Sequence, residues 1–189
     1  MKIGLFDHVE HGKRALATLF DERLAFAKAA EEAGIYCLHV AEHHATPLNM
    51  VPVPGVYLAA VARATKRMRL GPLVYLLPLY SPLRLIEEIC ILDHLSHGRM
   101  EVGVGRGVSP FELKYHKIDH DESRAIFIDA FNCISAGLTT DSINIPASTT
   151  NTKACRSPCG RCSSRILPSG TAHPIPPAPP GRANRACTS

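Results

Sequence analysis

The chain has 189 residues, of which 46% are hydrophobic and 20% charged, and its formal net charge is +4 at pH 7. This length suits one domain of ordinary size, with enough apolar residues for a globular core. The longest apolar stretch, residues 70–80, is too short to span a bilayer and contains two prolines. We therefore expect no membrane-spanning segment, and no signal peptide, because residues 1–7 turn polar too early for one.

The composition changes sharply near residue 146. Residues 146–189 contain six Lys/Arg, no Asp/Glu, no Phe or Tyr, and eight of the fifteen prolines. Such a segment buries too little apolar surface to offset its ordering entropy, so we expect a disordered tail. It lacks aromatic residues on which bases could stack and amphipathic spacing for a membrane surface, so we expect neither nucleic-acid nor membrane binding. The expected folded domain is residues 1–145, whose net charge is −2 because the tail carries +6.

Four strand–helix pairs are predicted along residues 1–145. The strands are short, nearly continuous apolar runs, and the helices carry apolar residues at helical spacing. The predicted strands are 2–7, 36–41, 68–77 and 99–104, and the predicted helices are 20–33, 56–65, 82 towards 98, and 122–136. This order is typical of parallel β/α units with both sheet faces covered. An open doubly wound sheet and the first half of a (β/α)8 barrel both fit it.

Titratable side chains follow the second predicted strand, in the triplet Glu42-His43-His44. The C-terminal edge of a parallel sheet is where such folds usually place their chemistry. Histidine titrates near neutral pH, and a neighbouring carboxylate shifts or orients it. The triplet is therefore a candidate acid–base site, and one packed and one solvated imidazole is the structural alternative.

The fourth predicted strand ends in Gly103-Val-Gly-Arg-Gly107. Glycines let backbone amides approach a bound group, and the Arg106 guanidinium suits a phosphate. The spacing is not the Gly-x-Gly-x-x-Gly of dinucleotide sites, so a phosphate site and a glycine turn with a solvated arginine both fit. The apolar run 71–78 is suited either to facing a flat ring or to filling the core.

Together these segments resemble the bacterial luciferase-like family of flavin-dependent monooxygenases. The resemblance covers residues 1–140 and rests on segments in the family's order and spacing: Lys2-Ile-Gly-Leu-Phe6, Glu31-Glu-Ala-Gly-Ile35, Val40-Ala-Glu-His-His44, Leu70-Gly-Pro-Leu-Val-Tyr-Leu-Leu-Pro78, Pro82-Leu-Arg-Leu-Ile-Glu-Glu88, Leu92-Asp-His-Leu-Ser-His-Gly-Arg99 and Val102-Gly-Val-Gly-Arg-Gly107. It implies an α/β fold, the first four β/α units of a (β/α)8 TIM barrel, truncated and followed by the tail.

The resemblance also implies a chemistry. It implies that reduced FMN, or coenzyme F420 in some branches, binds at the C-terminal rim, and that O2 oxidises an aldehyde or another small organic substrate. A flavin reductase is the implied partner. Truncation is expected to weaken or abolish this activity.

By the same resemblance, His43 is an acid or base near the flavin and Glu42 is a carboxylate that lines the pocket. These two are the expected catalytic residues. No metal ligand is implied.

The implied cofactor-binding residues lie on the third and fourth strands. Leu73 and Val74 match the pair that lies against the isoalloxazine ring, and Arg106, between Gly105 and Gly107, matches the phosphate-binding arginine.

Two other functions fit the residues. A metal-dependent hydrolase on a β/α barrel would draw on the ten histidines, although consecutive residues such as His43 and His44 diverge on a strand. A non-catalytic half-barrel would expose unpaired sheet edges, which favour a homodimer.

Residues 146–189 also fit an out-of-frame product. Reading the codons of 147–156 and 159–172 in the neighbouring frame permits strings similar to the family's continuation, so we hypothesise a frame slip near Ile145. The Cys-x3-Cys-x2-Cys spacing of residues 155–162 is that of radical S-adenosylmethionine enzymes, but we assign no iron–sulfur cluster to this proline-rich context. Three cysteines, Cys37, Cys90 and Cys133, are scattered singly through the predicted domain, which favours a reduced, cytoplasmic location.

Overall fold

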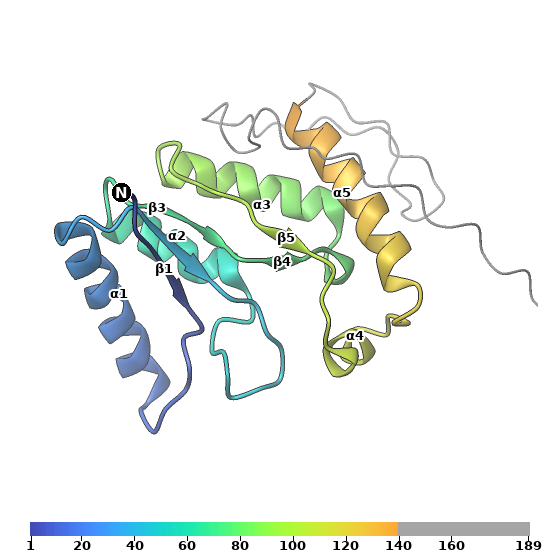
Figure 1. Ribbon diagram of the computed structural model, residues 1–189, viewed down its shortest axis with the longest axis horizontal. Coiled ribbons are helices and arrows are strands. Elements are labelled where there is room, and N and C mark those ends of the chain that lie inside the picture. The colour runs from blue at the N-terminus through green and yellow to red at the C-terminus, as the bar shows by residue number, and fades with distance from the viewer. Residues whose placement is uncertain (140–189) are drawn as a thin grey trace, which may run out of the picture.

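The computed structural model describes residues 1–139 (Figure 1). Strands and helices alternate along them in the order β1 Gly4–Asp7, α1 Leu16–Glu32, β2 Cys37–Val40, α2 Pro54–Ala64, β3 Arg69–Pro72, β4 Tyr75–Leu76, the 3-10 helix η1 Leu77–Leu79, α3 Pro82–Leu95, β5 Val104–Gly105, α4 Pro110–Tyr115 and α5 Ser123–Thr139. The predicted tail, residues 146–189, and the hypothesised frame slip near Ile145 fall within residues 140–189, which lie outside the described residues.

The strands pair in parallel. β1, β2 and β3 form a sheet in that order, with Gly4 opposite Cys37 and Cys37 opposite Arg69. A second parallel pair joins β4 to β5, and a bridge between Leu70 and Met100 brings the segment before β5 alongside β3. The predicted α/β class with parallel strands is therefore confirmed, while closure into a barrel stays a prediction.

Alternation along the strands decides which side chains enter the core. Leu38, Val40 and Leu70 are buried on one face of the sheet and belong to the core that α2 and α3 also supply. In Figure 1, α2 lies behind β2 and β3. The opposite face carries Phe6, which is half exposed, and the half-buried His39. Each fully buried leucine contributes about 1.5–3 kcal/mol relative to an exposed one, so this core holds the strands in register.

Two predicted elements differ from the structure in a way that matters for the site. The predicted strand 68–77 is two short strands, separated by Leu73 and Val74, whose peptide bond is cis. The segment predicted as strand 99–104 runs alongside β3 and β4 and forms backbone hydrogen bonds with them. Only its end belongs to a regular strand, β5. Helix α4 was not predicted at all.

Polar side chains hold the loops at the N-terminal edge of the sheet. Glu31, at the end of α1, accepts backbone hydrogen bonds from Lys66, Arg67 and Met68, just before β3. Arg99 is buried, and it donates to carbonyls at the end of α2 and to that of Met68, just before β3. These contacts fix where the strands begin, and so where their opposite ends emerge.

None of the helices in residues 1–139 combines the length and the apolar character that crossing a bilayer requires.

Candidate active site

The C-terminal ends of the parallel strands meet along one edge of the molecule. Backbone hydrogen bonds run across this edge from Ala41 to Asp7 (3.0 Å), from Leu73 to Val40 (2.8 Å) and from Tyr75 to Gly103 (2.8 Å). The residues that follow these strands therefore emerge next to one another. They are His8, the triplet 42–44, Leu73 with Val74, and Arg106.

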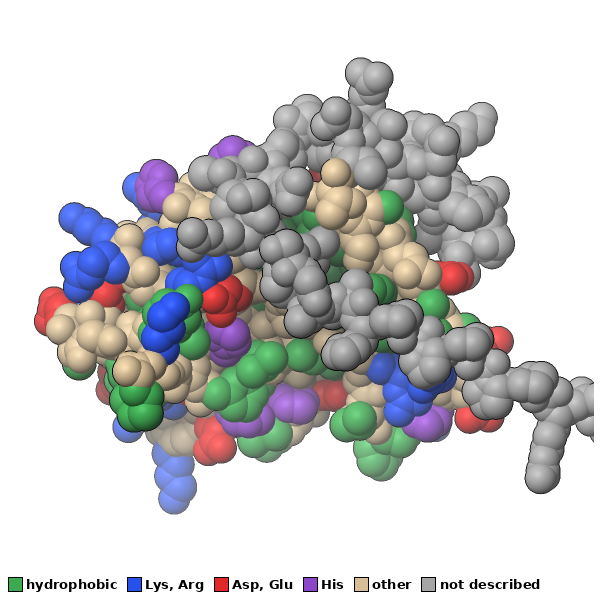
Figure 2. All heavy atoms as spheres, turned by 45° about the horizontal axis from the view of Figure 1, so that its top comes forward, with side chains coloured by type: hydrophobic (Ala, Val, Ile, Leu, Met, Phe, Trp, Pro, Cys, Tyr) green, Lys and Arg blue, Asp and Glu red, His purple; other side chains and the backbone are tan. Residues whose placement is uncertain are grey.

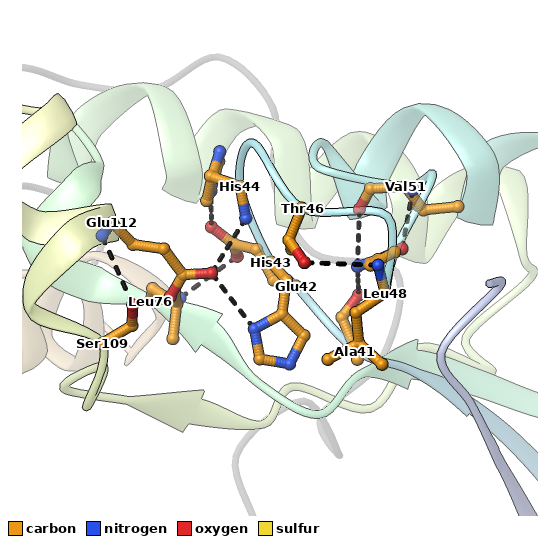
Figure 3. Close-up of polar contacts among 11 residues, drawn as sticks. Ala41, Glu42, His43, His44, Thr46, Leu48, Val51, Leu76, Ser109 and Glu112 are labelled. Carbon is orange, nitrogen blue, oxygen red and sulfur yellow. Dashed lines mark hydrogen bonds and ion pairs between the residues drawn. The ribbon is translucent and has the colours of Figure 1, made fainter. Parts of the chain in front are cut away.

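Glu42 is the most deeply buried member of the triplet, with 3% of its surface exposed. Its Oε2 accepts hydrogen bonds from the backbone N–H of Leu76 (3.1 Å) and from the hydroxyl of Tyr80 (2.9 Å). Its Oε1 accepts a third from Nε2 of His44 (2.9 Å), as Figure 3 shows. Burial, followed by the charge of Glu42, raises the pKa of Tyr80 well above its usual range, so the phenol stays a donor. Glu42 thus links His44, Tyr80 and the backbone of Leu76.

His43 points away from Glu42 and keeps part of its ring accessible, with 32% of its side chain exposed. Its Nδ1 lies 3.1 Å from Oε1 of Glu112 (Figure 3). Because a carboxylate accepts, Nδ1 carries the proton of this hydrogen bond, and Nε2 is the nitrogen left for a ligand. The imidazole stacks on that of His8, with ring centroids 5.6 Å apart and an interplanar angle of 6°.

Glu112 was not predicted as a site residue from the sequence. This buried residue on α4 accepts hydrogen bonds at Oε1 from Nδ1 of His43 and from the backbone N–H of His44 (2.9 Å). Ser109 caps α4 by accepting from the backbone N–H of Glu112 (3.4 Å). The spacing Ser109-x-x-Glu112 is that of a capping box, a signal that identifies the start of a helix but not the contact with His43.

His8 was also missed. Its ring makes an edge contact with Phe6, with centroids 4.9 Å apart, and its buried Nδ1 has no hydrogen-bond partner among residues 1–139. A histidine one residue beyond a predicted strand is a detectable signal, but its stacking on His43 depends on the register of β1 with β2. Figure 2 shows histidine and hydrophobic side chains next to one another on the surface in view.

The predicted flavin-contacting residues divide into accessible and packed ones. Leu73 is 45% exposed, and Arg106 is partly exposed and forms no side-chain hydrogen bond or ion pair with residues 1–139. By contrast, a Cβ on Gly105 would lie 2.6 Å from Cγ2 of Val74, so close packing alone requires this glycine. Gly107 has a φ of +80°, a conformation that glycine adopts without strain.

The triplet does not gather into a metal centre. His43 and His44 engage two different carboxylates, Glu112 and Glu42. Within residues 1–139, three or more side chains of metal-ligand type come together at one place, formed by Cys37, His39 and Glu101. The geometry at the triplet therefore gives no support to the alternative of a metal-dependent hydrolase.

An apolar cavity of about 370 Å³ lies between α1 and α2. Its lining comes from both helices and the loop before α2: Phe20, Leu24, Met50, Val51, Pro52, Val53, Val56, Tyr57 and Ala60. It shares no residue with the edge described above.

Comparison with known proteins identifies close sequence and structural similarity. Residues 1–176 match the model of the luciferase-like monooxygenase family. Over 130 residues the chain is 46% identical to the uncharacterized protein y4wF of Sinorhizobium fredii, an alignment that covers 69% of this chain and 38% of y4wF. Over 116 residues it is 32% identical to the oxygenase component of the flavin-dependent trigonelline monooxygenase of Acinetobacter baylyi, covering 60% of this chain and 32% of that protein.

The fold is also similar to a solved structure. The oxygenating constituent of 3,6-diketocamphane monooxygenase of Pseudomonas putida, a type II Baeyer–Villiger monooxygenase in complex with FMN, superimposes with a TM-score of 0.72 at 24% identity. That superposition covers 78% of this chain and 42% of the other. The chain thus spans roughly a third to two fifths of the length of these relatives.

Proposed function

Because the chain belongs to the luciferase-like monooxygenase family, we propose that it is a flavin-dependent monooxygenase that binds reduced FMN and oxidises an aldehyde or another small organic substrate with O2. The observation that carries this proposal is the edge on which a partly exposed imidazole, an exposed leucine and a partly exposed arginine emerge together. These are the side chains of His43, Leu73 and Arg106.

The residues at this edge suit FMN. The Arg106 guanidinium has no recorded partner within residues 1–139 and can form charge-assisted hydrogen bonds to a phosphate. Leu73 offers an apolar contact to a planar ring, and Val74 is held behind it against Gly105. FMN is favoured over coenzyme F420 because the Pseudomonas relative was solved with FMN and the Acinetobacter relative is flavin-dependent.

The bound flavin would supply the electrons that activate O2. The protein's own contribution centres on His43, whose Nε2 would hold or transfer a proton while Glu112 keeps Nδ1 engaged. Glu42 acts indirectly, because it binds His44, Tyr80 and the backbone of Leu76 at once. The rigid edge that results keeps the imidazole at one distance from the ligand.

We also propose partners for this chain, namely a flavin reductase and a second copy of the chain. The Acinetobacter relative is named an oxygenase component, which supports a separate reductase that supplies reduced flavin to this chain. A homodimer and a cytoplasmic location remain part of the proposal. The thiols of Cys37 and Cys133 are free, as expected for a reducing compartment.

Turnover with externally reduced flavin tests the function. FMN reduced chemically under nitrogen is mixed with the full chain, air and a series of aldehydes, and the carboxylic acids are quantified by mass spectrometry. We expect product above the level formed by free flavin, and a reduction of about 10²–10⁴-fold in His43→Gln, the range typical of a lost general acid or base. Product at the free-flavin level with every aldehyde of the series would contradict the proposal that the chain oxidises aldehydes.

A further inference from the structure

A cysteine, a histidine and a glutamate converge on the open face of the sheet, away from the flavin edge. Cys37 and His39 lie two residues apart on β2, so both side chains leave the same face. Glu101 reaches them from the segment before β5. One ligand atom from each of the three lies within 4.8 Å of the others.

Strand register explains why these distant residues meet. His39 pairs with Gly71 on β3, and the Leu70–Met100 bridge places Glu101 beside Gly71 in the next strand segment. Gly71 has no side chain, so the backbone of Glu101 can approach it closely, and from there the Glu101 carboxylate reaches His39. A Cβ on Gly71 would lie 1.9 Å from the backbone oxygen of Glu101, so this close approach requires glycine.

Two of the donor atoms lie at a spacing close to that of zinc ligands. Nε2 of His39 lies 3.0 Å from Oε2 of Glu101, and two ligands of a tetrahedral zinc ion are about 3.4 Å apart, as follows from bonds of about 2.0–2.2 Å. An ion would replace the hydrogen bond between Oε2 and Nε2 of His39, while the other carboxylate oxygen, Oε1, stays bound to Arg69. Such an outer partner is usual for a metal-bound carboxylate.

The site is open enough to take an ion from solution. The side chains of His39 and Glu101 are 18% and 30% exposed, and Cys37 is half-buried. Gly4, opposite Cys37 on β1, leaves room for the thiol, because a Cβ there would lie 2.5 Å from Sγ.

We propose that Cys37, His39 and Glu101 bind one zinc ion, or a divalent cation of similar preference for sulfur and nitrogen, with a fourth position open to water. Sulfur, imidazole and carboxylate together are a ligand set typical of zinc, whereas magnesium and calcium prefer oxygen alone. Binding releases the thiol proton to solvent. The site is separate from His43 and Arg106 and does not depend on the flavin proposal.

Cobalt(II) titration of the full chain tests the site, since a cobalt–thiolate bond gives a near-ultraviolet charge-transfer band. Four further cysteines could bind metal and must be replaced by serine in the protein used: Cys155, Cys159, Cys162 and Cys187. We expect one cobalt per chain, displaced by zinc, with the thiolate band present. Absence of the band at stoichiometric cobalt would overturn the proposal.

Ligand variants in the same background complete the test. We expect Cys37→Ser to remove the thiolate band, and His39→Gln and Glu101→Gln to weaken cobalt binding at least 10-fold. Cys133→Ser, which replaces another half-buried thiol, is the matched control and should leave the titration unchanged. Thermal unfolding without metal shows that each variant is folded. Unchanged affinity in folded His39→Gln, or loss of the band in Cys133→Ser, would also overturn the proposal.

Discussion

Glu112 on α4 binds His43 at the end of β2 across 69 residues of sequence, with 3.1 Å between Oε1 and Nδ1. The same carboxylate oxygen accepts the backbone N–H of His44, so one side chain fixes both the ring and the turn that carries it. This relationship makes Glu112 the residue on which the orientation of His43 depends.

Glu112→Ala should therefore destabilise the protein by about 1–3 kcal/mol, because two donors lose a buried acceptor. The free energy of unfolding in urea measures the loss. The control is Glu122→Ala, which removes an exposed carboxylate of the neighbouring segment and should change stability by less than about 0.5 kcal/mol. Equal effects of the two substitutions would show that the contact with His43 does not stabilise this edge.

Tyr80→Phe should cost about 1–3 kcal/mol of unfolding free energy. The substitution removes only the hydroxyl that donates to the buried carboxylate of Glu42, and hydrogen bonds to charged groups lie at the upper end of the usual range. Tyr115→Phe is the matched control, since this tyrosine is 65% exposed. A Tyr80→Phe variant as stable as Tyr115→Phe would refute the positioning role of Glu42 through this bond.

Gly105→Ala should destabilise by about 1–3 kcal/mol through overpacking, because the added Cβ would meet Cγ2 of Val74. Val74→Ala removes that atom, so the double variant should be less destabilised than the sum of the two single ones. Chemical denaturation of all four proteins gives the coupling energy. Strict additivity would mean that Gly105 is required for a reason other than this contact.

Stability should fall in acid partly through Glu31. Burial by itself would raise the pKa of this carboxyl, but the backbone N–H groups of Met68, Arg67 and Lys66 together hold its pKa below the ordinary value of 4.5. A depressed pKa stabilises the fold above the unfolded-state pKa, and that contribution is lost as pH falls through the folded-state pKa. The stability difference between the wild type and Glu31→Gln should thus be constant near neutral pH and shrink below about pH 4.5.

Unfolding free energies from pH 7 to pH 3 check this dependence. Glu32→Gln, at the exposed neighbouring position, should show no such trend. A Glu31→Gln difference that is the same at every pH would contradict the role of the ionised carboxylate.

Local sequence patterns predicted which strand ends gather at the edge, because the triplet 42–44 and Arg106 each follow a run of strand-forming residues. His43 and Arg106 thus lie at the ends of the strands where the pattern placed them. The same patterns could not predict that Glu112 binds His43, since this contact depends on how α4 folds back after β5. They also could not predict the break at Leu73 and Val74, where the apolar run continues although the strand stops.

The cluster of Cys37, His39 and Glu101 also could not be predicted from local sequence patterns. The spacing of Cys37 and His39 indicates a shared face once β2 is assigned, but Glu101 joins them only through the register of two further strand segments and the missing side chain of Gly71. Contacts that depend on the register of several strands therefore cannot be predicted from the sequence pattern of a single strand.

Comparison of FMN with riboflavin tests the central claim most directly, because the two differ only in the phosphate assigned to Arg106. Binding is followed by quenching of flavin fluorescence in the wild type, in Arg106→Ala and in the control Lys114→Ala, which removes an exposed cation from α4. We expect FMN to bind about 10- to 150-fold more tightly than riboflavin, the equivalent of about 1.5–3 kcal/mol for a charge-assisted phosphate contact. This preference should disappear in Arg106→Ala and persist in Lys114→Ala. Equal binding of FMN and riboflavin by the wild type, or no binding of either at tens of micromolar, would contradict the account.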